Sequence, residues 1–175
     1  MGKYQLFICK VCGDPYMGTD APSRCPFCGA YHENIVPAEE WEPLWGKPLG
    51  EKSRKHLEEA LQLEVSNTNF YRNASKTSRD VWAQKEFKAL MKIEKEHAET
   101  IVKLLGAEMP DIEGMELEED RARDSVEGNL AESHRRETRA INAYRMAMGD
   151  VEDDFVKFFF GELVKVETDH LSLSE

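Results

Sequence analysis

Residues 51–175 contain no cysteine and only one proline, Pro110. Long apolar runs are also missing, because the most apolar stretch, residues 155–164, is interrupted by two charged residues and a glycine. A transmembrane helix needs about 20 consecutive apolar residues, so we expect none in this chain. The N-terminus likewise has no apolar segment of the kind that marks a secretory signal, and we expect a soluble, cytoplasmic protein.

Positive charge is scarce. The chain has 23 Lys and Arg residues against 34 Asp and Glu residues, which gives a formal net charge of −11 at pH 7. A strongly acidic protein is repelled by nucleic acids and by anionic membrane surfaces. We therefore expect neither as a partner.

The cysteines form two close pairs, Cys9 with Cys12 and Cys25 with Cys28. Disulfide-stapled proteins rarely gather their cysteines so tightly, so the pairs indicate a metal site. Each pair can place two thiolates on one side of a metal, and the glycine that follows each pair lets backbone N–H groups turn toward sulfur. Four thiolates suit tetrahedral iron or zinc, and the spacing alone leaves open a zinc ribbon that only stabilises a small domain.

Composition changes near residue 50, since the first 50 residues hold the cysteines and six of the seven prolines. Beyond residue 50, long stretches rich in Glu, Lys, Ala and Leu predict a mainly α-helical fold, a four-helix bundle with one crossover at 106–116. The expected helices cover 51–75, 79–105, 118–148 and 151–172, with a short turn at Gly149-Asp150. The expected domains are a small irregular β metal-binding module in 1–45, a linker in 46–50 and the bundle in 51–175.

The helical part repeats itself at an offset of 73 residues. In the first helix of each half, Glu64, Asn69, Tyr71, Arg72 and Ala74 recur as Glu137, Asn142, Tyr144, Arg145 and Ala147. In the second, Leu90, Lys92, Glu94 and His97 recur as Leu163, Lys165, Glu167 and His170. A repeat that keeps Glu and His as faithfully as it keeps Leu indicates a duplicated helix hairpin with a shared chemical role.

Residues three apart on a helix are neighbours, so Glu94 with His97 and Glu167 with His170 each present a carboxylate and an imidazole on one face. Each pair follows a lone glutamate, Glu64 or Glu137, by 30 residues. Four Glu and two His from four helices are the ligand set of ferritin-like di-iron bundles. Their four negative charges would match two Fe(II) ions. The alternative, that these glutamates line solvated faces, conflicts with the apolar positions around them.

Three further residues are candidates near this site. Tyr71 and Tyr144 lie two turns beyond Glu64 and Glu137 on the same faces, where they could donate hydrogen bonds to ligand carboxylates or simply fill the core. His134 precedes Glu137 by one turn and is a possible extra ligand, a hydrogen-bond donor to a ligand, or a residue at the mouth of the bundle.

The first 40 residues resemble the rubredoxin-like domain of the rubrerythrin family through the pattern Cys9-x2-Cys12-Gly13-x4-Gly18-x2-Ala21-Pro22-x2-Cys25-Pro26-x-Cys28. Residues 51–172 resemble the bundle of the same family, and the domain order is similar to that of the reverse rubrerythrins. The resemblance implies one iron at the four cysteines, which passes single electrons and is shielded by Phe7, Tyr16, Phe27 and Tyr31. The family's additional third-helix glutamate is replaced by Ala140, which places its ligand switching in question here.

The resemblance implies a peroxidase that reduces hydrogen peroxide to water with electrons from an external NAD(P)H-dependent reductase. Glu94 and Glu167 would bridge two irons, with Glu64, Glu137, His97 and His170 as the remaining ligands. A homodimer, or a larger homo-oligomer, would place one chain's module near its partner's bundle. The alternatives are an oxygen reductase, a ferroxidase or iron-storage protein, or a non-catalytic zinc-ribbon and helical-bundle interaction protein. Zinc or manganese could also replace iron.

Overall fold

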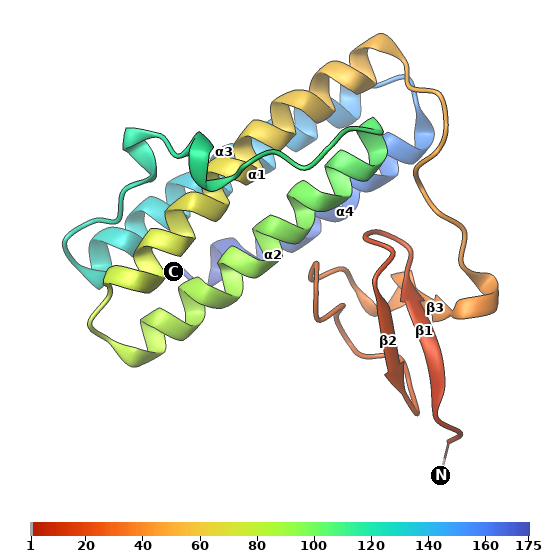
Figure 1. Cartoon of the computed structure of the whole chain (residues 1–175), viewed down its shortest axis with the longest axis horizontal. Coiled ribbons are helices and arrows are strands. Elements are labelled where there is room, and N and C mark those ends of the chain that lie inside the picture. The colour runs from red at the N-terminus through yellow and green to blue at the C-terminus, as the bar shows by residue number, and fades with distance from the viewer. Residues whose placement is uncertain (1) are drawn as a thin grey trace.

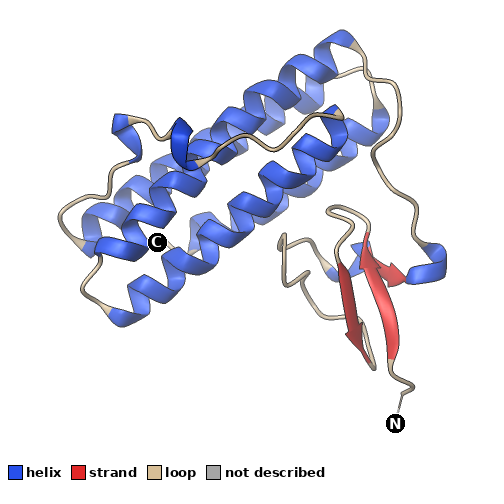
Figure 2. Ribbon diagram, viewed as in Figure 1, coloured by secondary structure: helices blue, strands red, loops and turns tan. Residues whose placement is uncertain are grey.

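The computed structural model describes residues 2–175, which form a helical bundle and a small N-terminal module (Figures 1 and 2). The module holds the strands β1 (Gln5–Cys9), β2 (Pro15–Gly18) and β3 (Ile35–Pro37). The bundle consists of α1 (Glu51–Thr77), α2 (Val81–Leu105), α3 (Val126–Asp150) and α4 (Asp154–Ser172). The module's sheet is antiparallel throughout, with the strand order β2-β1-β3. The mainly α-helical fold with a small strand region is as predicted.

The bundle is built from two helix hairpins, α1 with α2 and α3 with α4. The carboxylate of Asp80 caps α2 by accepting a hydrogen bond from the Ala83 backbone, and α2 ends at Gly106 with a φ of 62°. Left-handed glycine is a common helix stop because it lacks a Cβ. Along residues 2–175, no helix combines the length and the apolar character needed to cross a membrane.

The third helix begins at Val126, eight residues later than predicted. The segment before it forms a short 3-10 helix, Glu118–Asp120, and then runs to Ser125, whose hydroxyl caps α3. The cause is tertiary. Asp120 is buried and binds the guanidinium of Arg136 and the hydroxyl of Ser66, which fixes the crossover across α1 and α3.

The turn between α3 and α4 also differs from the prediction, since Gly149 and Asp150 belong to α3 and the turn covers 151–153. The Asp153 carboxylate accepts a hydrogen bond from the Gly50 backbone at 2.8 Å and does not cap α4. The predicted linker is therefore attached to the far hairpin of the bundle immediately before α1 begins.

The module lies against α2 and α4 of its own chain (Figure 1). Arg24 and Tyr31 both bind Asp169 on α4, and the Asn34 side chain donates to Glu162 at 2.7 Å. Buried residues of the module and the bundle form one continuous hydrophobic cluster. The module therefore packs against the bundle of its own chain, and its expected proximity to a partner's bundle stays a prediction.

Candidate metal centres

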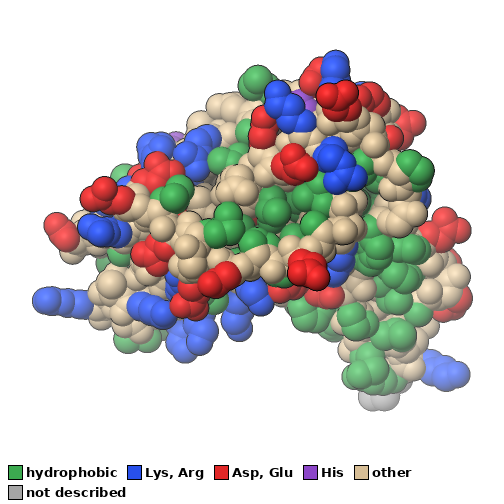
Figure 3. All heavy atoms as spheres, turned by 45° about the horizontal axis from the view of Figure 1, so that its top comes forward, with side chains coloured by type: hydrophobic (Ala, Val, Ile, Leu, Met, Phe, Trp, Pro, Cys, Tyr) green, Lys and Arg blue, Asp and Glu red, His purple; other side chains and the backbone are tan. Residues whose placement is uncertain are grey.

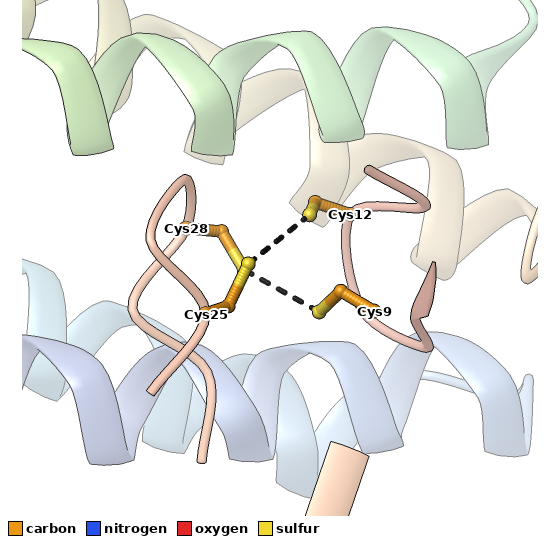
Figure 4. Close-up of side chains that lie close together, drawn as sticks. All are labelled: Cys9, Cys12, Cys25 and Cys28. Atoms are coloured by element: carbon orange, nitrogen blue, oxygen red, sulfur yellow. Dashed lines mark hydrogen bonds between the residues drawn. The ribbon is translucent and has the colours of Figure 1, made fainter. Parts of the chain in front are cut away.

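The four cysteines converge from two facing loops of the module (Figure 4). The Sγ atoms of Cys9 and Cys28 are 3.7 Å apart, and those of Cys12 and Cys25 are 3.8 Å apart. All four side chains are buried and none forms a disulfide. This spacing is what four thiolates around one tetrahedral metal require.

Backbone geometry shapes both cysteine loops. Gly13 and Gly29 have φ values of 80° and 78°, and their amides donate to the carbonyls of Cys9 and Cys25. The aromatic cover differs from the expectation, because Phe27 is exposed whereas Phe7 is buried.

Trp45, which the sequence did not indicate, takes part in the cover of the thiolate site. A Cβ at position 13 would come within 2.3 Å of the Trp45 ring. Glycine is therefore needed there both for its φ and for the close approach of the ring.

The six predicted Glu and His residues come together in the middle of the bundle, and all are buried. They form two groups of possible metal ligands: Glu64, Glu94, His97 and Glu167 in the first, and Glu94, Glu137, Glu167 and His170 in the second. The two groups share Glu94 and Glu167, the pair expected to bridge two metals. Each group contains three carboxylates and one imidazole, as ferritin-like di-metal sites do.

Buried polar atoms in this cluster point at one another without forming hydrogen bonds. Within the described residues, the Nδ1 atoms of both histidines and both carboxylate oxygens of Glu94 and Glu167 have no hydrogen-bond partner. Nδ1 of His97 nevertheless lies 3.1 Å from Glu167, and Nδ1 of His170 lies 2.8 Å from it. Buried polar atoms almost always have a hydrogen-bond partner. Imidazole nitrogens and carboxylate oxygens that converge without one are therefore suited to bind metal ions.

The orientation of His97 supports the same conclusion. Its Nε2 atom lies 2.9 Å from the backbone oxygen of Cys28, and a carbonyl oxygen can only accept. The proton is therefore on Nε2, and in the neutral ring the lone pair of Nδ1 faces the carboxylates. A metal-binding histidine is commonly held in this way through its second nitrogen.

The electrostatics of the cluster favour added positive charge. Burial, together with the charge of Glu94, raises the pKa of Glu64 and Glu137 well above the usual value. Burial also raises the pKa of Glu167, but the two imidazoles outweigh it and hold that pKa below its usual range. Without metal the group would have to take up protons, whereas two divalent ions neutralise four carboxylates directly.

Both tyrosines connect the two hairpins. Tyr71 on α1 donates to Glu137 on α3, and Tyr144 on α3 donates to Glu64 on α1. Burial, reinforced by the nearby glutamates, raises the pKa of both hydroxyls well above the usual value, so they remain donors. Tyr71 has an additional partner that the sequence did not indicate, the hydroxyl of Ser133 at 2.8 Å.

His134 does not join the cluster. It is exposed on α3, and its ring lies 3.2 Å from the Ser174 hydroxyl. A residue three positions before Glu137 is rotated by about 60° around the helix, which here is enough to face outward. The prediction that His134 is an extra ligand is therefore not supported by its position, which is outside both ligand groups.

A four-helix bundle with two buried ligand groups that share two glutamates belongs to the ferritin-like class of metal proteins. A model of the rubrerythrin family matches residues 55–174, more than half of the chain. The chain therefore belongs to the rubrerythrin family. No curated protein matches it.

Proposed function

We propose that this protein is a non-haem di-iron peroxidase that reduces hydrogen peroxide to water, with electrons relayed from a single iron at the four cysteines. The observation that carries this proposal is the 2.9 Å hydrogen bond from Nε2 of His97 to the carbonyl of Cys28. Cys28 is a candidate thiolate ligand and His97 a candidate ligand of the buried cluster. Their backbone and side-chain atoms thus connect the two sites through one hydrogen bond.

The six side chains of the cluster would hold two irons, Glu94 and Glu167 as bridges and the other four as terminal ligands. Two bound Fe(II) ions supply the two electrons that reductive cleavage of the O–O bond needs. The protein fixes the ligands before any reaction, because the bundle buries them and the tyrosine hydroxyls bind Glu64 and Glu137. Fixed ligands reduce the reorganisation that accompanies a change of charge.

The electron donor in this proposal is an external NAD(P)H-dependent reductase in the cytoplasm. Hydrophobic side chains gather on the module (Figure 3), among them the exposed Leu6 and Met17, which are cross-strand neighbours on β1 and β2. Exposed apolar groups of this kind are typical of surfaces that bind another protein transiently. We also propose that the chain forms a homodimer or a larger homo-oligomer. Its domains in this proposal are the module in 1–45, the linker in 46–50 and the bundle in 51–175.

Oxygen reduction, or ferroxidase action, is the second candidate. It is favoured by Ala140, which leaves a site with six ligands and no additional third-helix glutamate. Zinc or manganese at either centre, and a purely structural role for the cysteines, are further outcomes that metal analysis of protein purified without oxygen distinguishes.

The decisive experiment mixes the fully reduced protein with peroxide and, separately, with oxygen in a stopped-flow instrument. We expect peroxide to oxidise the bundle irons faster, and a faster reaction with oxygen would refute the peroxidase proposal. The Cys9→Ser variant tests the relay: it should react once with peroxide but fail to turn over with the reductase. Unchanged turnover in that variant would remove the cysteine site from the electron route.

A further inference from the structure

The two halves of the bundle match closely around the two tyrosines. At the offset of 73 residues, Tyr71 and Phe87 correspond to Tyr144 and Phe160. The rings of the first pair are stacked at 6.2 Å and those of the second at 5.5 Å. Each tyrosine donates to the glutamate of the opposite hairpin. One half can therefore serve as a template for what fills the space around the tyrosine in the other.

The template shows that two side chains are smaller beside Tyr144. Ser133, whose hydroxyl binds Tyr71, corresponds to Ala60, and Phe70, whose ring lies 5.2 Å from that of Tyr71, corresponds to Ala143. In residues 2–175, the Tyr144 hydroxyl has no partner besides Glu64. A phenol that donates its proton can still accept a hydrogen bond, and that position beside Tyr144 is unfilled.

The residues that cover the two tyrosines from the outside also differ, and those on the Tyr144 side are again smaller. On the Tyr71 side, the fully buried Arg136 binds Glu132 at 2.8 Å and Asp120 at 3.1 Å, which seals that side beneath the crossover. The residue that corresponds to Arg136 is Leu63, which is only half-buried. The crossover segment passes over α1 (Figure 1) and its Asp120 belongs to the Tyr71 side alone.

A cavity of about 30 Å³ occupies the unfilled space between α1 and α3. It reaches from the exposed Glu59 to the buried residues Tyr144 and Phe160, and Ala60 and Ala143 form part of its wall. A cavity measured in this way needs a volume of about 10–15 Å³ to hold one water molecule. This cavity is therefore large enough for one water or one hydrogen peroxide molecule.

We propose that this cavity is a binding site for a small O–H donor, hydrogen peroxide during the reaction and water otherwise, which donates to the Tyr144 hydroxyl at the place that Ser133 fills beside Tyr71. The site lies on the side of Glu64, so it is also the route by which the oxidant reaches the buried cluster. The choice of peroxide as the ligand rests on the proposed function, whereas the site itself rests on the cavity and on the unfilled acceptor.

The first test is crystallographic and requires no turnover. Crystals of the full-length, zinc-loaded protein should show an ordered oxygen within hydrogen-bond distance of the Tyr144 hydroxyl, and a peroxide soak should replace it with density for two atoms. In the Ala60→Ser variant, the new hydroxyl should take this position and the ordered oxygen should disappear. An empty cavity in the native crystals would overturn the site, and a single unchanged atom after the soak would overturn the assignment of peroxide.

The second test is kinetic and uses the iron-loaded protein. Ala143→Phe introduces a ring like that of Phe70, which fills the corresponding place beside Tyr71. It should therefore lower the second-order rate constant for oxidation by peroxide by about tenfold. Met146→Phe places the same ring on the exposed face of α3 and should leave the rate unchanged. Equal rates in both variants, with full iron content, would overturn the route. If the native protein does not react with peroxide, the proposed function fails and the crystals alone decide on the site.

Discussion

Replacement of Gly29 by alanine should detach the module from the bundle, and its cost can be worked out from the structure. Gly29 has a φ of 78°, and a Cβ there would lie 2.9 Å from Cγ1 of Val166 on α4. The left-handed backbone costs about 1–2 kcal/mol with a side chain present, and overpacking against a buried valine costs about 1–3 kcal/mol. The total is about 2–5 kcal/mol, and it falls on the residue that directly follows Cys28.

The two contributions can be separated by a double-mutant cycle. Val166→Ala removes both methyl groups nearest the new Cβ, so in the double variant only the backbone cost should remain, with a coupling of about 1–3 kcal/mol. Gly46→Ala is the matched control. Its φ of 80° is within 2° of that of Gly29, but no atom lies within 4 Å of the added Cβ. It should cost only the backbone term, and Val166→Ala should not change that cost.

Two measurements follow the effect. In iron-loaded protein, loss of the iron–thiolate absorption in guanidinium chloride would report the stability of the module. The rate at which the reduced thiolate iron is reoxidised after one addition of peroxide would report the proposed electron transfer to the bundle. Gly29→Ala should lower both, and the double variant should recover much of the rate. A Gly29→Ala protein with native stability and a native rate, or a complete absence of coupling to Val166, would refute the claim that this contact holds the two sites together.

Three further predictions concern the bundle. Glu94→Ala should lower the iron content of the bundle from near two per chain, because Glu94 belongs to both ligand groups; metal analysis with unchanged bundle iron would remove it from the site. Arg136→Met should destabilise the protein by about 3–5 kcal/mol in denaturant unfolding, because Asp120 is left buried without its ion pair; the half-exposed Arg139→Met should change stability by no more than about 0.5 kcal/mol. Glu132→Gln tests pH dependence: burial raises the pKa of Glu132, but the surrounding arginines outweigh it and lower that pKa from 4.5 to about 2. Its folded pKa is below the unfolded one, so the charge stabilises the protein above pH 4.5, and this contribution should fade as the pH falls toward 2; a difference between native and variant that does not change over this interval would contradict the assignment.

The sequence predicted the cluster because its information is local. A carboxylate and an imidazole three residues apart share a helix face wherever the helix lies, so Glu94 and His97 were expected together, and the structure brings them into one group of possible ligands. The start of α3 could not be found in the same way, because it depends on Asp120 binding Arg136 from another element. The prediction for His134 was wrong for a related reason. Its spacing from Glu137 along the helix does not tell whether its side chain faces the cluster or the solvent.

The contact between module and bundle has no signature in the side-chain pattern. The acceptor of the His97 proton is the backbone oxygen of Cys28, an atom that every residue carries, so no motif identifies it. Gly29 was correctly expected to have a positive φ, but no sequence pattern indicated that Val166 lies over it. Such contacts join residues far apart in the chain and depend on shape and on backbone atoms. They can therefore be found only in the three-dimensional structure.

The duplicated halves supply the same candidate ligands, yet the residues around the two ligand groups differ. The position held by Glu64 and His97 has both connections: Cys28 binds the ring of His97, and the cavity ends at the tyrosine that binds Glu64. The position held by Glu137 and His170 lies on the side where Arg136 and the crossover close the bundle. On our proposals, the ligand group that contains Glu64 and His97 would therefore receive both the electrons and the oxidant, and Glu94 and Glu167 would connect it to the second group. An asymmetry of this kind could not come from the duplicated ligands, so it must come from the residues that diverged around them.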